Sequence, residues 1–173
     1  MPHETEPSVA GRDMTDVRPG GHAYLFGLGS PHGGDLLGWL AADGLREALN
    51  DRDDVSVDCL AQPVDLFLHA VTASDRLLLV DAMRGQGPPG TLKVFSPGEL
   101  AETFEPLSSL SSHGLDLAGT LALVEALGLC RAGIRIIGIE MPAGADPDAP
   151  PPRLGEEEAR RLHEAVMDWL DAD

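Results

Sequence analysis

Alternating runs of hydrophobic and polar positions predict a chain in which strands and helices follow one another. Short apolar runs bounded by Gly, Pro or polar residues are typical of strands that helices cover on both faces. The pattern predicts strands at residues 22–29, 54–61, 76–82, 91–97 and 134–140. This order indicates an α/β fold, a three-layer sandwich with a mostly parallel, twisted central sheet of about five strands and helices on both faces.

Helical spacing of apolar residues predicts the intervening elements. The pattern predicts helices at residues 36–49, at 63–71, from 117 to Gly128, and from about 155 to the end. In the short second helix, Val64, Phe67 and Leu68 are expected to face the core. Acidic residues 156–158 suit the positive N-terminus of the last helix.

Length and composition fit one globular domain. Of the 173 residues, 43% are hydrophobic and 24% are charged. We interpret residues 1–20 as a polar, flexible tail and residues 21–173 as a single domain. The N-terminal segment contains no apolar signal core, which predicts a cytoplasmic protein. Cys59 and Cys130 lie in apolar surroundings, so we expect buried free thiols rather than a disulfide.

The charge balance excludes two classes of partner. The formal net charge is −17. Nucleic acids and anionic membranes attract Lys and Arg, so neither is an expected partner. The charge is compatible with a basic protein partner.

Three polar residues fall where strands or loops end. Asp35 lies in the Gly-rich loop after the first strand, Asp81 closes the third strand, and His113 precedes a helix. Ligands of such sheets bind outside the carboxyl ends of the strands. Two carboxylates and a neutral imidazole form a plausible ligand set for a divalent transition metal. Each residue also has a structural interpretation: Asp81 caps its own turn, Asp35 caps the following helix, and His113 forms loop hydrogen bonds.

Other chemistries find less support in the sequence. The glycines at 27, 29 and 33 do not follow the dinucleotide fingerprint, and the loop has no Walker lysine. Ser111 and Ser112 adjoin His113, yet no nucleophile elbow is present. His32 is a candidate extra ligand or a solvent-facing loop residue. Glu140 ends the last strand, where we favour a turn-capping role over a contact with the site.

The chain resembles the hydrogenase maturation endopeptidases in several blocks that follow the family's order. The blocks are GLGSPHGGDLLGW, LLLVDAMRGQGPPGTL, SSHGLDLAGTLALVEALG and IRIIGIEMP. The resemblance implies an α/β sandwich that removes the C-terminal extension of the nickel–iron hydrogenase large subunit precursor. It also implies that the metal is nickel, supplied by that precursor, and that the protease acts as a monomer without a permanently bound metal.

The resemblance carries the metal contacts over to Asp35, Asp81 and His113, and either carboxylate is a candidate catalytic base. The first block departs from the family pattern, because Ser30 replaces an Asn and the acidic pair is reduced to Asp35. One alignment places Asp35 at the metal-contacting position, and another places Leu36 there. A non-catalytic maturation factor that binds nickel or the large subunit is the alternative function.

Overall fold

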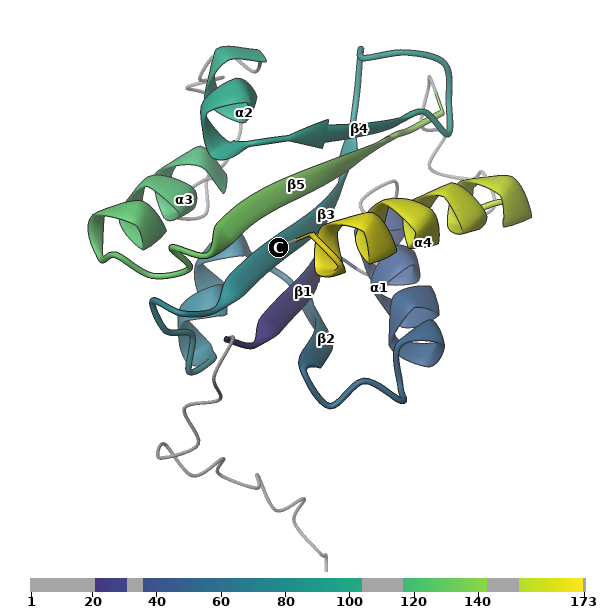
Figure 1. The fold of residues 1–173 in the computed structure, drawn as a ribbon. Coiled ribbons are helices and arrows are strands. Elements are labelled where there is room, and N and C mark those ends of the chain that lie inside the picture. Colours follow the sequence, from purple (N-terminus) through teal and green to yellow (C-terminus); the bar gives the residue numbers. More distant parts are fainter. Residues whose placement is uncertain (1–20, 31–35, 104–116, 143–152, 173) are drawn as a thin grey trace, which may run out of the picture.

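A five-stranded sheet forms the centre of the molecule (Figure 1). The computed structural model describes residues 21–30, 36–103, 117–142 and 153–172. The strands are β1 (Ala23–Leu28), β2 (Val55–Leu60), β3 (Arg76–Met83), β4 (Leu92–Phe95) and β5 (Gly133–Glu140). Their order across the sheet is β2-β1-β3-β5-β4, and only β4 among these strands runs antiparallel to its neighbour. The predicted fold class is therefore confirmed.

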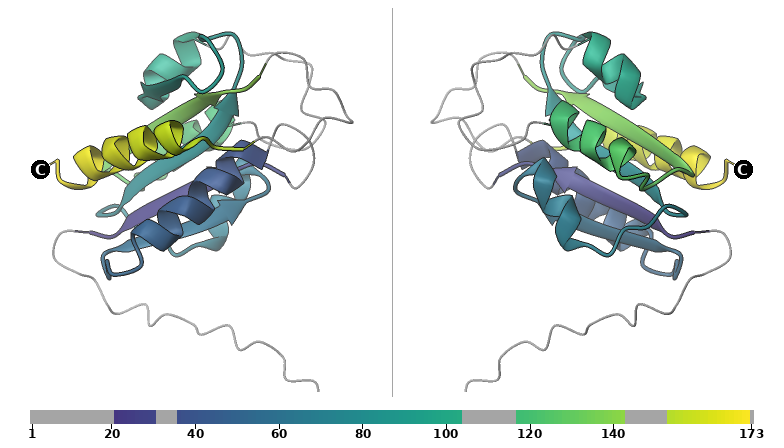
Figure 2. Two further views of the ribbon diagram at one scale, coloured as in Figure 1. Left: turned by 90° about the vertical axis from the view of Figure 1, so that its right-hand side faces the viewer. Right: turned by 90° about the vertical axis from the view of Figure 1, so that its left-hand side faces the viewer.

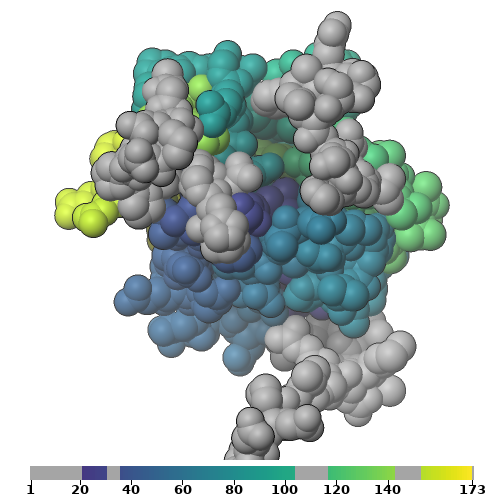
Figure 3. Space-filling view, turned by 180° about the vertical axis from the view of Figure 1, so that it is seen from behind, coloured from purple at the N-terminus to yellow at the C-terminus, as the bar shows by residue number. Residues whose placement is uncertain are grey.

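Helices cover both faces of this sheet. The helical elements are α1 (Leu36–Ala48), the 3₁₀ helix η2 (Pro63–Leu68), α2 (Pro97–Thr103), α3 (Leu117–Ala126) and α4 (Glu156–Leu170). The two views of Figure 2 show α1 and α4 over one face and α3 and η2 over the other. Seen from behind, the green α3 and the yellow-green start of α4 lie on opposite sides of the molecule (Figure 3). None of the described helices is long and apolar enough to cross a bilayer.

The period-two alternation of the strands divides the core into two clusters. In β3, Leu77 and Leu79 pack under α3 and η2, whereas Leu78 and Val80 pack under α1 and α4. All four side chains are at most 1% exposed. Because β3 lies in the middle of the sheet, its continuous aliphatic run serves both clusters, as the sequence predicts.

Some expectations for individual residues are wrong. Leu68 is 85% exposed, and Leu66 is the fully buried residue of η2. A short 3₁₀ turn brings each side chain to a different position than the α-helical spacing assumed for that segment. Helix α2 was not predicted. Both cysteines are free, but Cys59 is only partly buried. Burial raises the pKa of the Cys130 thiol to about 12, which keeps that thiol protonated.

Two glycines let α1 approach the sheet closely. A Cβ atom on Gly27 of β1 would lie 2.1 Å from the Gly38 carbonyl oxygen of α1. A Cβ atom on Gly38 would lie 2.0 Å from the Leu28 carbonyl oxygen and 2.8 Å from that of Val80. No side chain fits in either place, so the first turn of α1 rests directly on the ends of β1 and β3.

Arg76 fastens the end of α4 to the start of β3. Its guanidinium donates hydrogen bonds to the carbonyl oxygens of Trp169, Leu170 and Ala172 at 3.0, 2.9 and 3.1 Å. The guanidinium carbon also lies 5.0 Å from the centre of the Trp169 ring. A cation at this position satisfies the last carbonyls of the helix and opposes the negative end of its dipole. Because the C-terminus of α4 lies beside the start of β3, its N-terminus points to the other end of the strands, where the parallel strands have their carboxyl ends.

Candidate active site at the carboxyl ends of the strands

The sheet has a topological switch point between β1 and β3. From β1 the chain continues to β2 on one side, whereas β3 lies on the other side of β1. In open α/β sheets, the crevice at the carboxyl ends of two such strands is where ligands bind. Asp81, near the end of β3, lies at this position. The switch point thus selects the carboxylate that the sequence also singled out.

Asp81 is partly buried beside the end of its strand. Its Oδ1 accepts a hydrogen bond of 2.8 Å from the Ala82 backbone N–H. The alternation along β3 places Asp81 on the face of Leu79 and Met83, which is the face that α3 covers. Asp81 therefore does cap its own backbone, and this local bond orients the carboxylate near the end of β3.

Three helices direct their positive N-termini toward this rim. Helix α1 follows β1 directly, and its first turn lies against the Val80 carbonyl. The C-terminus of α3 lies at the amino ends of the strands, because the Cys130 N–H that follows the helix donates to the carbonyl oxygen of Thr72, just before β3 begins. Helix α4 also ends at these amino ends, beside Arg76. The helix dipoles favour negative charge at the rim.

Glu140 holds the loop that follows β3. Glu140 is 5% exposed, and its carboxylate accepts hydrogen bonds from the backbone N–H groups of Gly85 and Gln86, at 2.7 and 2.9 Å. The Glu140 carbonyl oxygen accepts a further bond of 2.9 Å from Gly90 N–H. Glu140 thus braces the turn-rich segment between β3 and β4, which confirms the turn-capping role predicted from the sequence.

Replacing Glu140 by Gln is expected to lower the free energy of unfolding by about 1–3 kcal/mol. Each carboxylate oxygen accepts one backbone N–H. The Gln amide nitrogen would face one of those donors and leave it unsatisfied in a partly buried place. Urea unfolding checks the loss, with Glu125→Gln on the exposed side of α3 as the control. A loss no larger than in the control would contradict the bracing role.

The other two predicted ligands, Asp35 and His113, lie outside the described residues. Helix α1 begins at Leu36, next to Asp35 in the sequence, and its first turn touches the end of β3. Helix α3 begins at Leu117, four positions after His113, and Leu117 packs on the Asp81 face of the sheet. The described residues alone contain no cluster of three or more His, Cys, Asp or Glu side chains suited to a metal. The predicted ligand set therefore stays a prediction.

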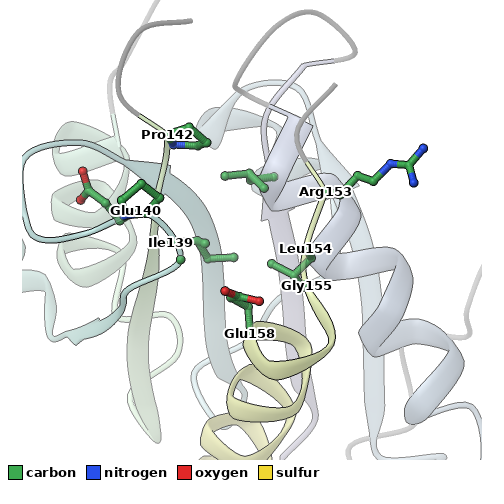
Figure 4. Close-up of a pocket in the computed structure, with 10 residues that line it drawn as sticks. Ile139, Glu140, Pro142, Arg153, Leu154, Gly155 and Glu158 are labelled. Carbon is green, nitrogen blue, oxygen red and sulfur yellow. The ribbon is translucent and has the colours of Figure 1, made fainter. Parts of the chain in front are cut away.

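A cavity of about 250 Å³ opens at the same rim, on the face that α1 and α4 cover (Figure 4). Its described lining includes Leu37 from α1, Ile139 and Glu140 from β5, and Glu158 from α4. The cavity has no counterpart among the sequence-based expectations, in which the acidic residues of α4 complement only the helix dipole. Gly155 and Glu158 are neighbours within the first turn of α4, whereas the approach of Gly90 to Glu158 depends on the fold and has no local sequence signal.

The fold and the rim define an α/β protein with a carboxylate-bearing site at the topological switch point. A family model described as hydrogenase maturation protease matches residues 45–166. This match spans well over half of the chain and includes Asp81, so the chain belongs to the hydrogenase maturation protease family and is a protease. Members of this family act on hydrogenase large subunit precursors. The match begins ten positions after Asp35, whose assignment it does not test.

Solved structures share the fold at low sequence identity. The hydrogenase maturation protease HycI from Thermococcus kodakarensis has a TM-score of 0.61 and 23% identity, with 87% of this chain and 93% of that chain covered. The hydrogenase maturating endopeptidase HybD from E. coli has a TM-score of 0.62 and 21% identity, with 86% and 91% covered. The solution structure of the endopeptidase HycI from Escherichia coli has a TM-score of 0.60 and 19% identity, with 86% and 91% covered. No curated protein sequence gave a match.

Proposed function

We propose that this protease removes the C-terminal extension of a nickel–iron hydrogenase large subunit precursor, and that it recognises nickel already bound in that precursor. The observation that carries the proposal is the position of Asp81. Its carboxylate lies at the switch point of the sheet, inside the segment that the family model matches. The nickel belongs to the substrate and is not a resident cofactor of the protease.

Asp35, Asp81 and His113 are the proposed contacts to the nickel of the precursor. Two oxygen donors and one imidazole nitrogen suit a divalent transition metal, and three protein ligands leave room for groups of the substrate. The start of α1 beside Val80 supports a contribution from the loop that contains Asp35. The start of α3 on the Asp81 face supports a contribution from the segment that contains His113.

Peptide cleavage needs a water molecule, a base to activate it and a polarised carbonyl group. Asp81 or Asp35 is proposed as the base, since the family resemblance assigns both carboxylates to the metal contacts. The nickel of the substrate would orient the scissile peptide next to that base. The N-termini of α1, α3 and α4 point to this end of the sheet, where helix dipoles favour negative charge.

Nickel loading of the precursor is expected to decide whether cleavage occurs. The purified protease is mixed with precursor that has or lacks nickel, and mass spectrometry follows the loss of the C-terminal peptide. We expect only the nickel-loaded precursor to be shortened. Cleavage of both forms would contradict nickel recognition, whereas a stable complex without cleavage would favour the non-catalytic maturation factor. A monomeric state and a cytoplasmic location stay predictions, which size-exclusion chromatography and cell fractionation test.

A further inference from the structure

The cavity at the rim combines apolar walls with one carboxylate. Leu37, Ile139 and Leu154 form the described walls, together with Pro89 and Pro142. Figure 4 shows the Glu158 carboxylate between Ile139 and the Leu154–Gly155 segment, at the inner end of this space. The cavity is therefore suited to a ligand with an apolar stem and a polar head.

Two glycines make room for the Glu158 carboxylate. A Cβ atom on Gly155 would lie 2.1 Å from Glu158 Oε2, and a Cβ atom on Gly90 would lie 2.6 Å from Glu158 Oε1. Gly90 also has a φ angle of +81°, which favours glycine. The backbone on both sides thus lies against the side chain and directs it along the cavity instead of into solvent.

The Glu158 carboxylate has no direct partner within the described part of the chain; Arg161, one turn further along α4, donates instead to the Gly90 carbonyl oxygen at 3.2 Å. No hydrogen bond or ion pair joins it to another described residue, whereas the neighbouring Glu157 pairs with Arg160 at 2.6 Å. Glu140 is turned toward Gly85 and Gln86. Arg153 also lines the cavity, but its guanidinium points away from Glu158 in Figure 4. A partly buried carboxylate beside apolar walls is stabilised best by a cation whose aliphatic stem can lie along those walls.

The cavity adjoins the proposed cleavage site. Leu37 precedes Gly38, whose backbone lies against the Val80 carbonyl, and Val80 precedes Asp81. Ile139 lies opposite Ala82 in the register of β3 and β5. The cavity and Asp81 therefore lie on opposite faces of the sheet, near the carboxyl ends of the neighbouring strands β3 and β5.

We propose that this cavity is a specificity subsite that binds a Lys or Arg side chain of the precursor, with Glu158 pairing with the cationic head. This inference rests on the proposed function, because it assumes that the large subunit precursor is the substrate. The net charge of −17 favours the approach of a basic segment in general, and Glu158 selects one residue within it.

Glu158→Gln is expected to raise KM for the nickel-loaded precursor about tenfold while kcat stays nearly unchanged. The matched control is Glu156→Gln, which removes a charge from the same helical turn but not from the cavity. A role limited to the helix dipole would give equal effects in the two variants. Equal KM values in Glu158→Gln and Glu156→Gln would overturn the proposal.

Substitutions in the precursor identify the bound residue. Each Lys and Arg near the cleavage point is replaced by Met in turn, and one replacement should raise KM for the wild-type protease but not for Glu158→Gln. Glu158→Lys should then regain activity on the precursor whose selected residue is changed to Glu. If every precursor replacement changes KM by the same factor for the wild-type protease and for Glu158→Gln, the result would contradict the subsite.

Binding measurements separate this inference from the proposed function. If the wild-type protease leaves every nickel-loaded precursor intact, the proposed function fails. Calorimetric titration with the same precursors then tests the cavity without cleavage. Weaker binding to Glu158→Gln than to Glu156→Gln would support the subsite, and equal binding would reject it.

Discussion

Asp81→Asn is expected to lower the rate of precursor cleavage by at least about a hundredfold, the range typical of losing a general base or a metal contact. Asn has nearly the shape of Asp, and its side-chain oxygen can still accept the bond from Ala82 N–H that the carboxylate accepts at 2.8 Å. The fold should therefore survive, and only the negative charge at the rim is lost. Single-turnover assays with nickel-loaded precursor measure the change.

Asp58→Asn is the matched control for this experiment. Asp58 Oδ1 accepts a bond of 2.9 Å from the next backbone N–H in the chain, that of Cys59, so its local geometry copies that of Asp81. Asp58 lies exposed on the edge strand β2, away from the switch point. We expect near wild-type cleavage from this variant. If Asp81→Asn cleaves as well as Asp58→Asn, Asp81 does not belong to the active site.

Gly38→Ala is expected to lower the free energy of unfolding by at least about 2 kcal/mol, although Ala is normally the better helix former. The new methyl group would lie 2.0 Å from the Leu28 carbonyl oxygen, so α1 must move away from the sheet. That movement also separates the start of α1 from Val80 and Asp81. Cleavage of the precursor should fall together with stability.

Gly44→Ala in the same helix is expected to change the free energy of unfolding in the opposite direction. A Cβ atom on Gly44 would meet nothing within 4 Å. The substitution should therefore raise the free energy of unfolding by about 0.5–1 kcal/mol through helix propensity alone. Urea unfolding of both variants measures the contrast. Similar changes of the same sign would show that α1 does not pack on the strand ends as described.

Local patterns predicted the elements in which one physical signal dominates. The aliphatic run of β3 can be satisfied only by burial on both faces, and its place in the middle of the sheet follows from that demand. The helical stripe of Leu121 and Val124 is likewise confirmed by full burial of both side chains. Asp81 was identifiable because a carboxylate directly follows such a buried run.

Features that depend on distant contacts could not be predicted in this way. Leu68 was expected inside because its segment has helical spacing, but the segment forms a 3₁₀ turn that exposes Leu68 to solvent. The cavity arises where the start of α4 meets the loop containing Gly90, and these segments are separated by β4, α2, α3 and β5. No local pattern encodes such a meeting. Asp35 and His113 depend on the same kind of convergence, and their assignment still rests on the family resemblance.

The guanidinium of Arg76 joins parts of the chain that lie 93 to 96 positions apart. Closing a contact over so many residues is costly in chain entropy, so we expect it to form late in folding, after the sheet that presents Arg76. The last turn of α4 and the start of β3 should therefore gain protection from hydrogen exchange together.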